Sequence, residues 1–222
     1  MTKILFGADD AGRGPVLGPM VIAGVTIDEK DEHLLKEIGA KDSKLLSPKQ
    51  REELFDKIKS LVKSYHIEII SPKEIDNAID SENSNLNDLE ALNFAKCVNA
   101  LKPDIAIIDC PSTNIQAYTI HLKTYLNVLP QLIIEHKAER HPIVAAASIL
   151  AKVTRDREIE KIQKTIKEPI GSGYPADPVT KEFIKNNWNK HQAIFRHTWE
   201  TYRKYSGEVL KKNKKQKSLS DF

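Results

Sequence analysis

Cysteine and aromatic residues are scarce in this sequence. Its 222 residues include two cysteines, Cys97 and Cys110, and only 6% of the residues are aromatic. The two cysteines stand in no CxxC or Cys/His spacing, which excludes a thiolate metal site and a disulfide framework. We expect two buried, reduced thiols.

Long apolar runs are also missing. No segment approaches the about 20 consecutive apolar residues that a membrane-spanning helix needs. The apolar run near the N-terminus, residues 4–8, is too short for a secretory signal, and acids and glycines follow it. We therefore expect a cytoplasmic protein that does not associate with a membrane. We also expect a monomer.

An excess of charge of one sign is confined to the end of the chain. Residues 206–222 contain five lysines against Glu208 and Asp221, a net charge of +3, which leaves 29 basic and 29 acidic side chains in the first 205 residues. The net charge of the body is therefore no argument for nucleic-acid binding. With no apolar periodicity, residues 206–222 are expected to form a flexible lysine-rich tail.

Apolar patterns in the body alternate between strands and helices. Strands are predicted at residues 3–8, 20–27, 66–70, 105–108 and 132–134, and helices from Ser47 to about 65 and at 87–101, 142–165, 178–190 and 197–205. Ser47-Pro48-Lys49-Gln50 is typical of a capped helix start. This alternation predicts an α/β fold, a mixed β-sheet flanked by helices. The C-terminal part, from about residue 170, is predicted to be helical, within one catalytic domain of residues 1–205.

Three aspartates follow predicted strands. Asp9 and Asp10 come after the first strand and Asp109 after the fourth, at the ends where sites form in α/β sheets. Converging carboxylates repel one another unless a hard divalent cation such as Mg²⁺ or Mn²⁺ binds them. Each aspartate taken alone is better explained as a helix cap or a turn residue. Asp9 and Asp10 can share one site only if the strand ends there, because neighbouring strand residues point to opposite faces.

Four segments resemble the signatures of one enzyme family, ribonuclease HII. They are Gly7-Ala-Asp-Asp-Ala-Gly-Arg-Gly-Pro-Val-Leu-Gly-Pro19, Lys41-Asp-Ser-Lys44, His136-Lys-Ala-Glu139 with Ala145-Ala-Ala-Ser-Ile-Leu-Ala-Lys152, and Gly171-Ser-Gly-Tyr-Pro175. Their order across residues 5–200 agrees with the family, and the last has an archaeal form.

The resemblance implies an RNase H-like fold and an endoribonuclease that uses metal ions. Such an enzyme hydrolyses the RNA strand of RNA–DNA hybrids and cuts 5′ of ribonucleotides embedded in duplex DNA, leaving a 3′-hydroxyl and a 5′-phosphate. The resemblance assigns catalysis and the binding of Mg²⁺ or Mn²⁺, with two ions expected during catalysis, to Asp9, Asp10, Asp109 and Glu139.

The family pattern is Asp-Glu-Asp-Asp, so Asp10 is one methylene shorter and Glu139 one longer than usual. We expect retained activity with an altered rate or metal preference. Asp156 is a less favoured candidate for the fourth acid.

The resemblance also implies a substrate-binding surface. The turn Gly12-Arg13-Gly14, with Tyr174, is expected to read the 2′-hydroxyl, since glycines let backbone amides approach the sugar closely. Ser148 and Lys152 share a helix face. The expected phosphate contacts are Lys41, Ser43, Lys44, Ser148 and Lys152. Without the resemblance, a lysine at such a position would be read as solvated surface and Tyr174 as a core residue.

The C-terminal segment Gln216-Lys-Ser-Leu219-Ser-Asp-Phe222 resembles the short peptide that docks on the replication sliding clamp. Leu219 and Phe222 would share one face of a helical turn and fill an apolar pocket, and Gln216 is the first residue of the pattern. The usual pattern ends in two aromatic residues, and this chain has one. The alternative is a tail that only raises nonspecific DNA affinity.

Two other functions compete with this interpretation. A different nuclease of the RNase H fold, acting on DNA alone, would also use clustered acids. A non-catalytic protein that binds RNA–DNA hybrids would be consistent with the changed lengths of Asp10 and Glu139. Cleavage of an all-DNA duplex would favour the first alternative, and poor Mg²⁺ binding would favour the second.

Overall fold

The structure, a computed structural model, describes residues 2–207. The chain forms two compact units. The first contains residues 2–11, Val21–Glu68 and Asn87–Thr154. The second contains Gly12–Met20, Ile69–Leu86 and the described residues from Arg155 onward.

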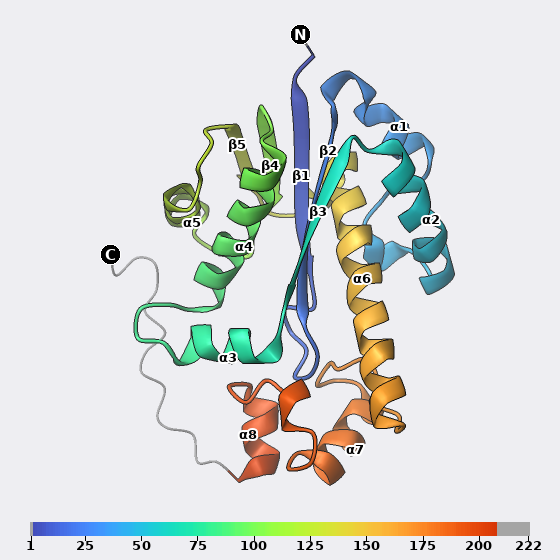
Figure 1. Cartoon of the computed structure of the whole chain (residues 1–222), viewed down its shortest axis with the longest axis vertical. Coiled ribbons are helices and arrows are strands. Elements are labelled where there is room, and N and C mark those ends of the chain that lie inside the picture. Colours follow the sequence, from blue (N-terminus) through green and yellow to red (C-terminus); the bar gives the residue numbers. More distant parts are fainter. Residues whose placement is uncertain (1, 208–222) are drawn as a thin grey trace. The chain divides into compact units, whose positions relative to one another are not determined.

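A five-stranded mixed sheet organises the first unit. Its spatial order is β3 (Ser64–Ile70), β2 (Met20–Asp28), β1 (Ile4–Ala11), β4 (Ile105–Asp109) and β5 (Gln131–Glu135), as Figure 1 shows. β1 pairs antiparallel with β2 and parallel with β4, and β4 pairs parallel with β5. The predicted α/β class with a mixed sheet is confirmed.

The first strand extends further than its apolar run predicted. Opposite β2, the ladder continues through Asp9↔Ala23 and Asp10↔Ile22 to Ala11↔Val21, whereas opposite β4 it ends at Ala8↔Ile108. The prediction that the strand ends before the acids was therefore wrong on the β2 side and correct on the β4 side. The cause is the neighbouring strand, which continues to supply backbone partners after the apolar run of β1 has stopped.

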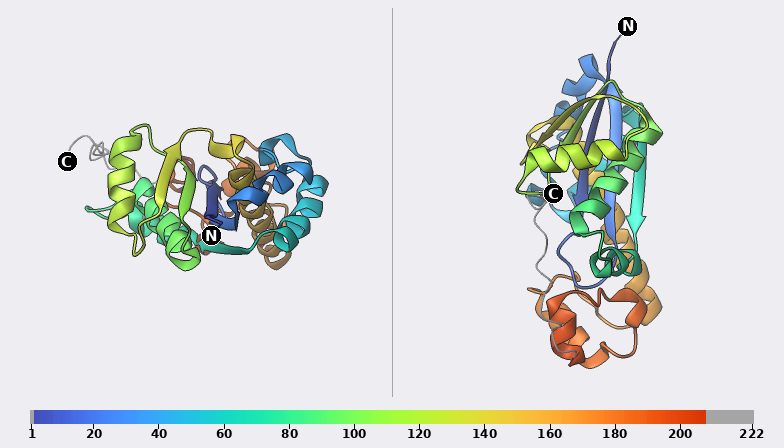
Figure 2. Two further views of the ribbon diagram at one scale, coloured as in Figure 1. Left: turned by 90° about the horizontal axis from the view of Figure 1, so that it is seen from above. Right: turned by 90° about the vertical axis from the view of Figure 1, so that its left-hand side faces the viewer.

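Helices cover both faces of the sheet in the first unit (Figure 2). A Cβ atom added at Gly7 would lie 2.6 Å from the backbone carbon of Ile143, so α6 packs against β1 at the distance that glycine allows. On the opposite face, the Phe6 ring and Cys97 of α4 both pack against Gly24. The first-unit helices are η1 (Glu29–Asp31), α1 (Glu32–Glu37), η2 (Ser43–Leu45), α2 (Pro48–Leu61), α4 (Leu86–Leu101), α5 (Ile115–Thr124), η3 (Ala138–Arg140) and the start of α6 (Pro142–Ile166).

The predicted capping box at Ser47 is confirmed. The Ser47 hydroxyl accepts the Gln50 N–H, and the Gln50 side chain accepts the Ser47 N–H. Ser71 and Glu74 form the same box at the start of α3, a helix that the sequence analysis missed.

The second unit has its own apolar core. It includes α3 (Pro72–Asp80), the end of α6, α7 (Pro178–Asn187), η4 (Gln192–Ile194) and α8 (Glu200–Ser206). This confirms the helical character of the last third of the chain. The buried core residues are Val16, Leu17, Ile159, Ile170, Phe183, Ile184, Phe195 and Tyr202.

Both cysteines are buried and unpaired, as predicted. Burial raises the pKa of the Cys97 thiol to about 12. Of the helices that the structure describes, none combines the length and apolarity that crossing a bilayer requires.

Candidate functional site

Two of the predicted acids lie side by side because of the register between β1 and β4. Ala8 pairs with Ile108, so Asp9 and Asp109 are the next residues of two adjacent parallel strands. Glu139 lies in the short helix η3, four residues after β5 ends, and Asp109 pairs with the last residue of that strand, Glu135. The strand ends of the sheet therefore bring acids from three separate segments into one region of the first unit.

Backbone amides hold the two aspartates. The Asp9 Oδ1 atom accepts the N–H of Asp10 at 2.7 Å. The Asp109 Oδ1 atom accepts the N–H of Ala138 at 2.8 Å, which ties the end of β4 to the turn that carries Glu139. Because backbone donors fix these side chains, the local fold orients them before any ligand arrives.

The charges of the four acids act on one another. Burial raises the pKa of Asp9 well above its usual value, and the negative charges of Asp10, Asp109 and Glu139 raise it further. Burial also raises the pKa of Asp109, and Glu139 adds to that effect. Burial and the repulsion between anionic groups both disfavour the charged carboxylates, so a bound cation would lower the energy of this cluster.

A lysine supplies part of the missing positive charge. The Lys44 Nζ atom lies 3.1 Å from Oε1 of Glu139. Although burial lowers the pKa of Lys44, its hydrogen bond to Glu139 and the charges of Glu139, Asp42 and Asp9 raise it above the usual value. The Lys41-Asp-Ser-Lys44 segment thus approaches the acids through its last residue.

Within residues 2–207, no three His, Cys, Asp or Glu side chains are close enough together to enclose a metal ion. The fit of the acids to a divalent cation therefore depends on the donor chemistry and the charge. Asp9 is 6% exposed and lies among three other carboxylates that all raise its pKa. Hard oxygen donors in this number suit Mg²⁺ or Mn²⁺.

The predicted phosphate contacts differ in exposure. Lys41 and Lys44 are exposed and Lys152 is half-buried. Ser43 and Ser148 are buried, and their hydroxyl oxygens lie 2.8 Å apart. The two serines therefore join η2 to α6 inside the first unit.

The turn Gly12-Arg13-Gly14 in the second unit is held by a buried arginine that sequence reasoning missed. Arg196 is 0% exposed and donates hydrogen bonds to the carbonyl oxygens of Gly12 at 2.6 Å and Arg13 at 2.9 Å. It also donates to Gly18 at 3.0 and 3.1 Å. The Trp199 indole, which stacks on Arg196, donates to the Gly14 carbonyl at 3.1 Å. These donors fix the carbonyl oxygens of the turn.

A second buried arginine joins this turn to the Gly171–Pro175 segment. Arg155 is 1% exposed, and its side chain packs against Gly12, where an added Cβ would lie 2.4 Å from the Arg155 Nε atom. Gly12 also has φ +87°, so both the lack of space for a Cβ atom and the backbone conformation require glycine here. Arg155 also donates to the carbonyl of Ser172 at 2.9 Å and lies 5.2 Å from the centre of the Tyr174 ring.

Tyr174 is brought next to the turn, as its predicted role requires. Tyr174 is 38% exposed, and a Cβ at Gly14 would lie 3.8 Å from its ring. Asp177 holds the same segment, because its carboxylate accepts the N–H and the hydroxyl of Ser172. These hydrogen bonds lower the pKa of Asp177 to about 2.

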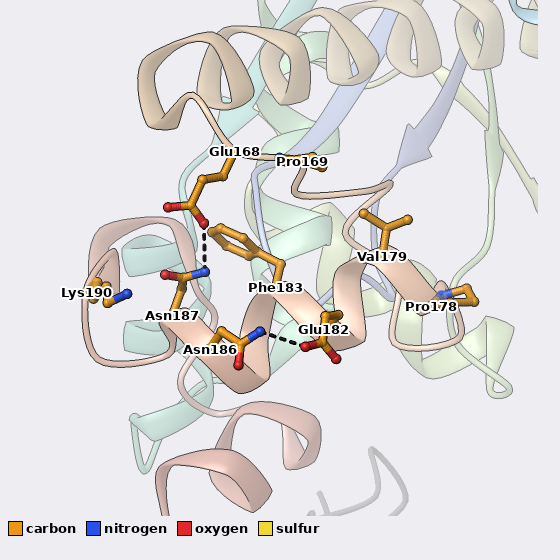
Figure 3. A pocket seen from close by; sticks show the side chains of 9 residues that line it. All are labelled: Glu168, Pro169, Pro178, Val179, Glu182, Phe183, Asn186, Asn187 and Lys190. Carbon is orange, nitrogen blue, oxygen red and sulfur yellow. Dashed lines mark hydrogen bonds between the residues drawn. The ribbon is translucent and has the colours of Figure 1, made fainter.

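The second unit also contains an open pocket that the sequence did not indicate. Its volume is about 540 Å³, with Phe183, Pro169 and Val179 as apolar lining (Figure 3). Some polar side chains at its rim hydrogen-bond to one another: Asn187 donates to Glu168 at 3.0 Å, and Asn186 donates to Glu182 at 2.7 Å. No predicted site residue lines it.

The other predicted residues are Asp156 and the three residues of the C-terminal motif. Asp156 lies in the second unit, 3.9 Å from the Arg155 Nη1 atom. Gln216, Leu219 and Phe222 lie outside the described residues, as does most of the predicted tail.

Comparisons with known proteins agree on one family. The Ribonuclease HII family model matches residues 6–202. Ribonuclease HII of Thermococcus sibiricus is 47% identical, covering 98% of this chain and 97% of its own. A crystal structure of ribonuclease H2 from Pyrococcus horikoshii OT3 superposes with a TM-score of 0.83 at 42% identity, covering 92% of this chain and 97% of that chain.

A structure of a complex of PCNA and RNase HII from Archaeoglobus fulgidus superposes with a TM-score of 0.79 at 36% identity. The match covers 98% of this chain and 100% of that chain. The α/β fold is thus RNase H-like, and the protein is an endonuclease of the ribonuclease H class. Within that class, the chain belongs to the ribonuclease HII family.

Replacing Arg196 by glutamine should destabilise the protein strongly. The substitution leaves the carbonyls of Gly12, Arg13 and Gly18 short of buried donors, which costs roughly 1–3 kcal/mol for each group. We expect urea unfolding to show a loss of about 3 kcal/mol or more. The matched control is Arg203→Gln. It removes a 3.8 Å ion pair with the exposed Asp80, a loss that should cost below about 1 kcal/mol. Equal losses in the two variants would contradict the role given to Arg196.

Proposed function

We propose that this enzyme hydrolyses the RNA strand of RNA–DNA hybrids and cuts 5′ of single ribonucleotides in duplex DNA. Water adds across the phosphodiester, leaving a 3′-hydroxyl on the upstream nucleotide and a 5′-phosphate on the ribonucleotide. The observation that carries the proposal is the β1–β4 register, which makes Asp9 and Asp109 neighbours with Glu139 close enough to raise the pKa of both. Membership of the ribonuclease HII family supports it.

Asp9, Asp10, Asp109 and Glu139 would hold the metal ions. Two bound Mg²⁺ or Mn²⁺ ions would lower the pKa of water and neutralise negative charge on the phosphate. The protein's own contribution is orientation: the N–H groups of Asp10 and Ala138 fix the carboxylates of Asp9 and Asp109. Lys44 orients Glu139 through its 3.1 Å ion pair.

Recognition of the ribonucleotide is assigned to the turn Gly12-Arg13-Gly14 and to Tyr174. With the carbonyls of Gly12, Arg13 and Gly14 engaged by Arg196 and Trp199, the polar groups of the turn would be presented to the 2′-hydroxyl in a fixed geometry. The exposed ring of Tyr174, supported from below by Arg155, would stack on the neighbouring deoxyribose. Lys41, Lys44 and Lys152, with the serine pair Ser43 and Ser148, would bind backbone phosphates.

The test is cleavage of a labelled DNA duplex that contains one ribonucleotide, with Mg²⁺ and with Mn²⁺. We expect one cut, 5′ of the ribonucleotide, and no cleavage of the all-DNA duplex. Asp9→Asn and Asp109→Asn should each reduce the rate by at least about 100-fold, since each removes a charged oxygen ligand. Cutting of the all-DNA control would indicate a DNA nuclease of the same fold, and tight binding without cutting would indicate a recognition protein.

The lengths of Asp10 and Glu139 should set the metal preference. Mg²⁺ demands a nearly ideal octahedral geometry, so acids of altered length penalise it more than they penalise other ions. The double variant Asp10→Glu, Glu139→Asp restores the usual family lengths. We expect it to raise the ratio of the Mg²⁺-supported rate to the Mn²⁺-supported rate by roughly tenfold or more. An unchanged ratio would show that the two lengths have no effect on metal use.

We also propose that the C-terminal segment binds a replication sliding clamp. The motif Gln216, Leu219 and Phe222 supports this, as does the complex of PCNA with the RNase HII of Archaeoglobus fulgidus. Deleting residues 216–222 should abolish association with the clamp in size-exclusion chromatography while leaving cleavage of short duplexes intact. The control is Lys211→Gln with Lys212→Gln, which lowers the tail's charge but keeps the motif. Clamp binding by the deleted protein would disprove the motif assignment.

A further inference from the structure

A positively charged pocket lies beside the acids in the first unit. It is open, has a volume of about 940 Å³, and is formed by the end of α1, the segment after it, and the turn from β5 to α6. Two residues, Lys44 and Glu139, belong both to this pocket and to the acid cluster. Its charged lining residues are Lys36, Lys41, Lys44, Lys137 and Arg140 against Asp42 and Glu139. This gives a local excess of positive charge in a body whose first 205 residues are neutral.

Several of these cations remain available to a ligand. All five basic side chains belong to exposed residues. Lys44 pairs with Glu139, and Arg140 pairs with Glu135. Within the described part of the chain, the ammonium groups of Lys36, Lys41 and Lys137 have no carboxylate within 4 Å. Their charge is therefore not neutralised by the fold.

The backbone of Lys137, which lines this pocket, is in a strained conformation. It has φ 57° and ψ 43°, a left-handed conformation that glycine and asparagine adopt more easily than lysine. The residue lies between the end of β5 and the helix η3, and the next residue, Ala138, donates its N–H to Asp109. The turn requires the left-handed conformation, but nothing in its backbone geometry requires an ammonium group. Strain of this kind is common at functional positions.

We propose that this pocket binds the sugar–phosphate backbone of a nucleic-acid strand next to the bond that is cut, with Lys36, Lys137 and Arg140 as contacts beyond those expected from the sequence. The inference rests on the proposed function, because it extends the same site. A strand carries one phosphate about every 3.4 Å along the helix axis, so a run of fixed cations beside the acids matches its charge. Such contacts position the strand and read neither base nor sugar.

The chain supplies a matched pair of variants for the test. Lys137 and Lys102 are both exposed lysines with positive φ, 57° and 47°, and only Lys137 lines the pocket. Asparagine tolerates this backbone conformation, so Lys137→Asn and Lys102→Asn should both fold, and each removes one positive charge. Binding is measured by fluorescence anisotropy in EDTA, which prevents cleavage, on an RNA–DNA hybrid and on an all-DNA duplex over a salt series.

We expect Lys137→Asn to weaken binding of both duplexes by roughly three- to eightfold near 0.1 M salt and to reduce the slope of log affinity against log salt by about 0.9. Lys102→Asn should leave both quantities unchanged. Adding Lys36→Gln to Lys137→Asn should reduce the slope by about 1.8 in total, because two phosphate contacts are lost.

Three outcomes would overturn the inference. Equal behaviour of Lys137→Asn and Lys102→Asn would mean that only net charge matters. A loss confined to the hybrid would mean that the pocket reads the sugar. Wild-type affinity and an unchanged salt slope in Lys137→Asn would mean that the pocket makes no contact with the strand. Because binding is measured without cleavage, failure here is distinct from a failure of the proposed hydrolysis.

Discussion

Electrostatic repulsion among carboxylates at the ends of β1 and β4 is the constraint on which the rest of the site depends. The parallel register that pairs Ala8 with Ile108 makes Asp9 and Asp109 neighbours, and the turn after β5 adds Glu139. Burial and mutual repulsion raise the pKa of both aspartates. The fold opposes this unfavourable arrangement with backbone N–H donors and with the ammonium of Lys44. An arrangement that is costly without a cation is suited to binding one.

Positive charge has two distinct uses in this protein. Arg155 and Arg196 are fully buried, and their guanidinium groups donate to backbone carbonyls of the second unit. They shape the turn that follows the first acids in the sequence. The lysines near the acids remain exposed and leave their charge available to a ligand. This division follows the chemistry of the two side chains, because the planar guanidinium presents five fixed donors whereas the ammonium is a mobile point charge.

Much of the fold and part of the site could be predicted from the sequence. Asp9 and Asp109 were identified because each follows an apolar strand, and Ser47 because its capping box is complete. Helix α3 could have been predicted as well, since Ser71-Pro72 with Glu74 repeats that signature. The roles of Arg155 and Arg196 could not. Arginine is mostly exposed in folded proteins, so the residue type alone predicts a surface position, and the Gly12 carbonyl that Arg196 binds is 184 positions away in the sequence.

Gly7 links the packing of the sheet to the chemistry of the acids. It lies two residues before Asp9, so both residues face the same side of β1. The side chain that glycine lacks leaves room for the backbone of Ile143 at the start of α6, and Glu139 lies four residues before Ile143. The main chains that lead to Asp9 and to Glu139 are therefore in direct contact near Gly7. A side chain at position 7 would push the start of α6, and with it the turn that carries Glu139, away from β1.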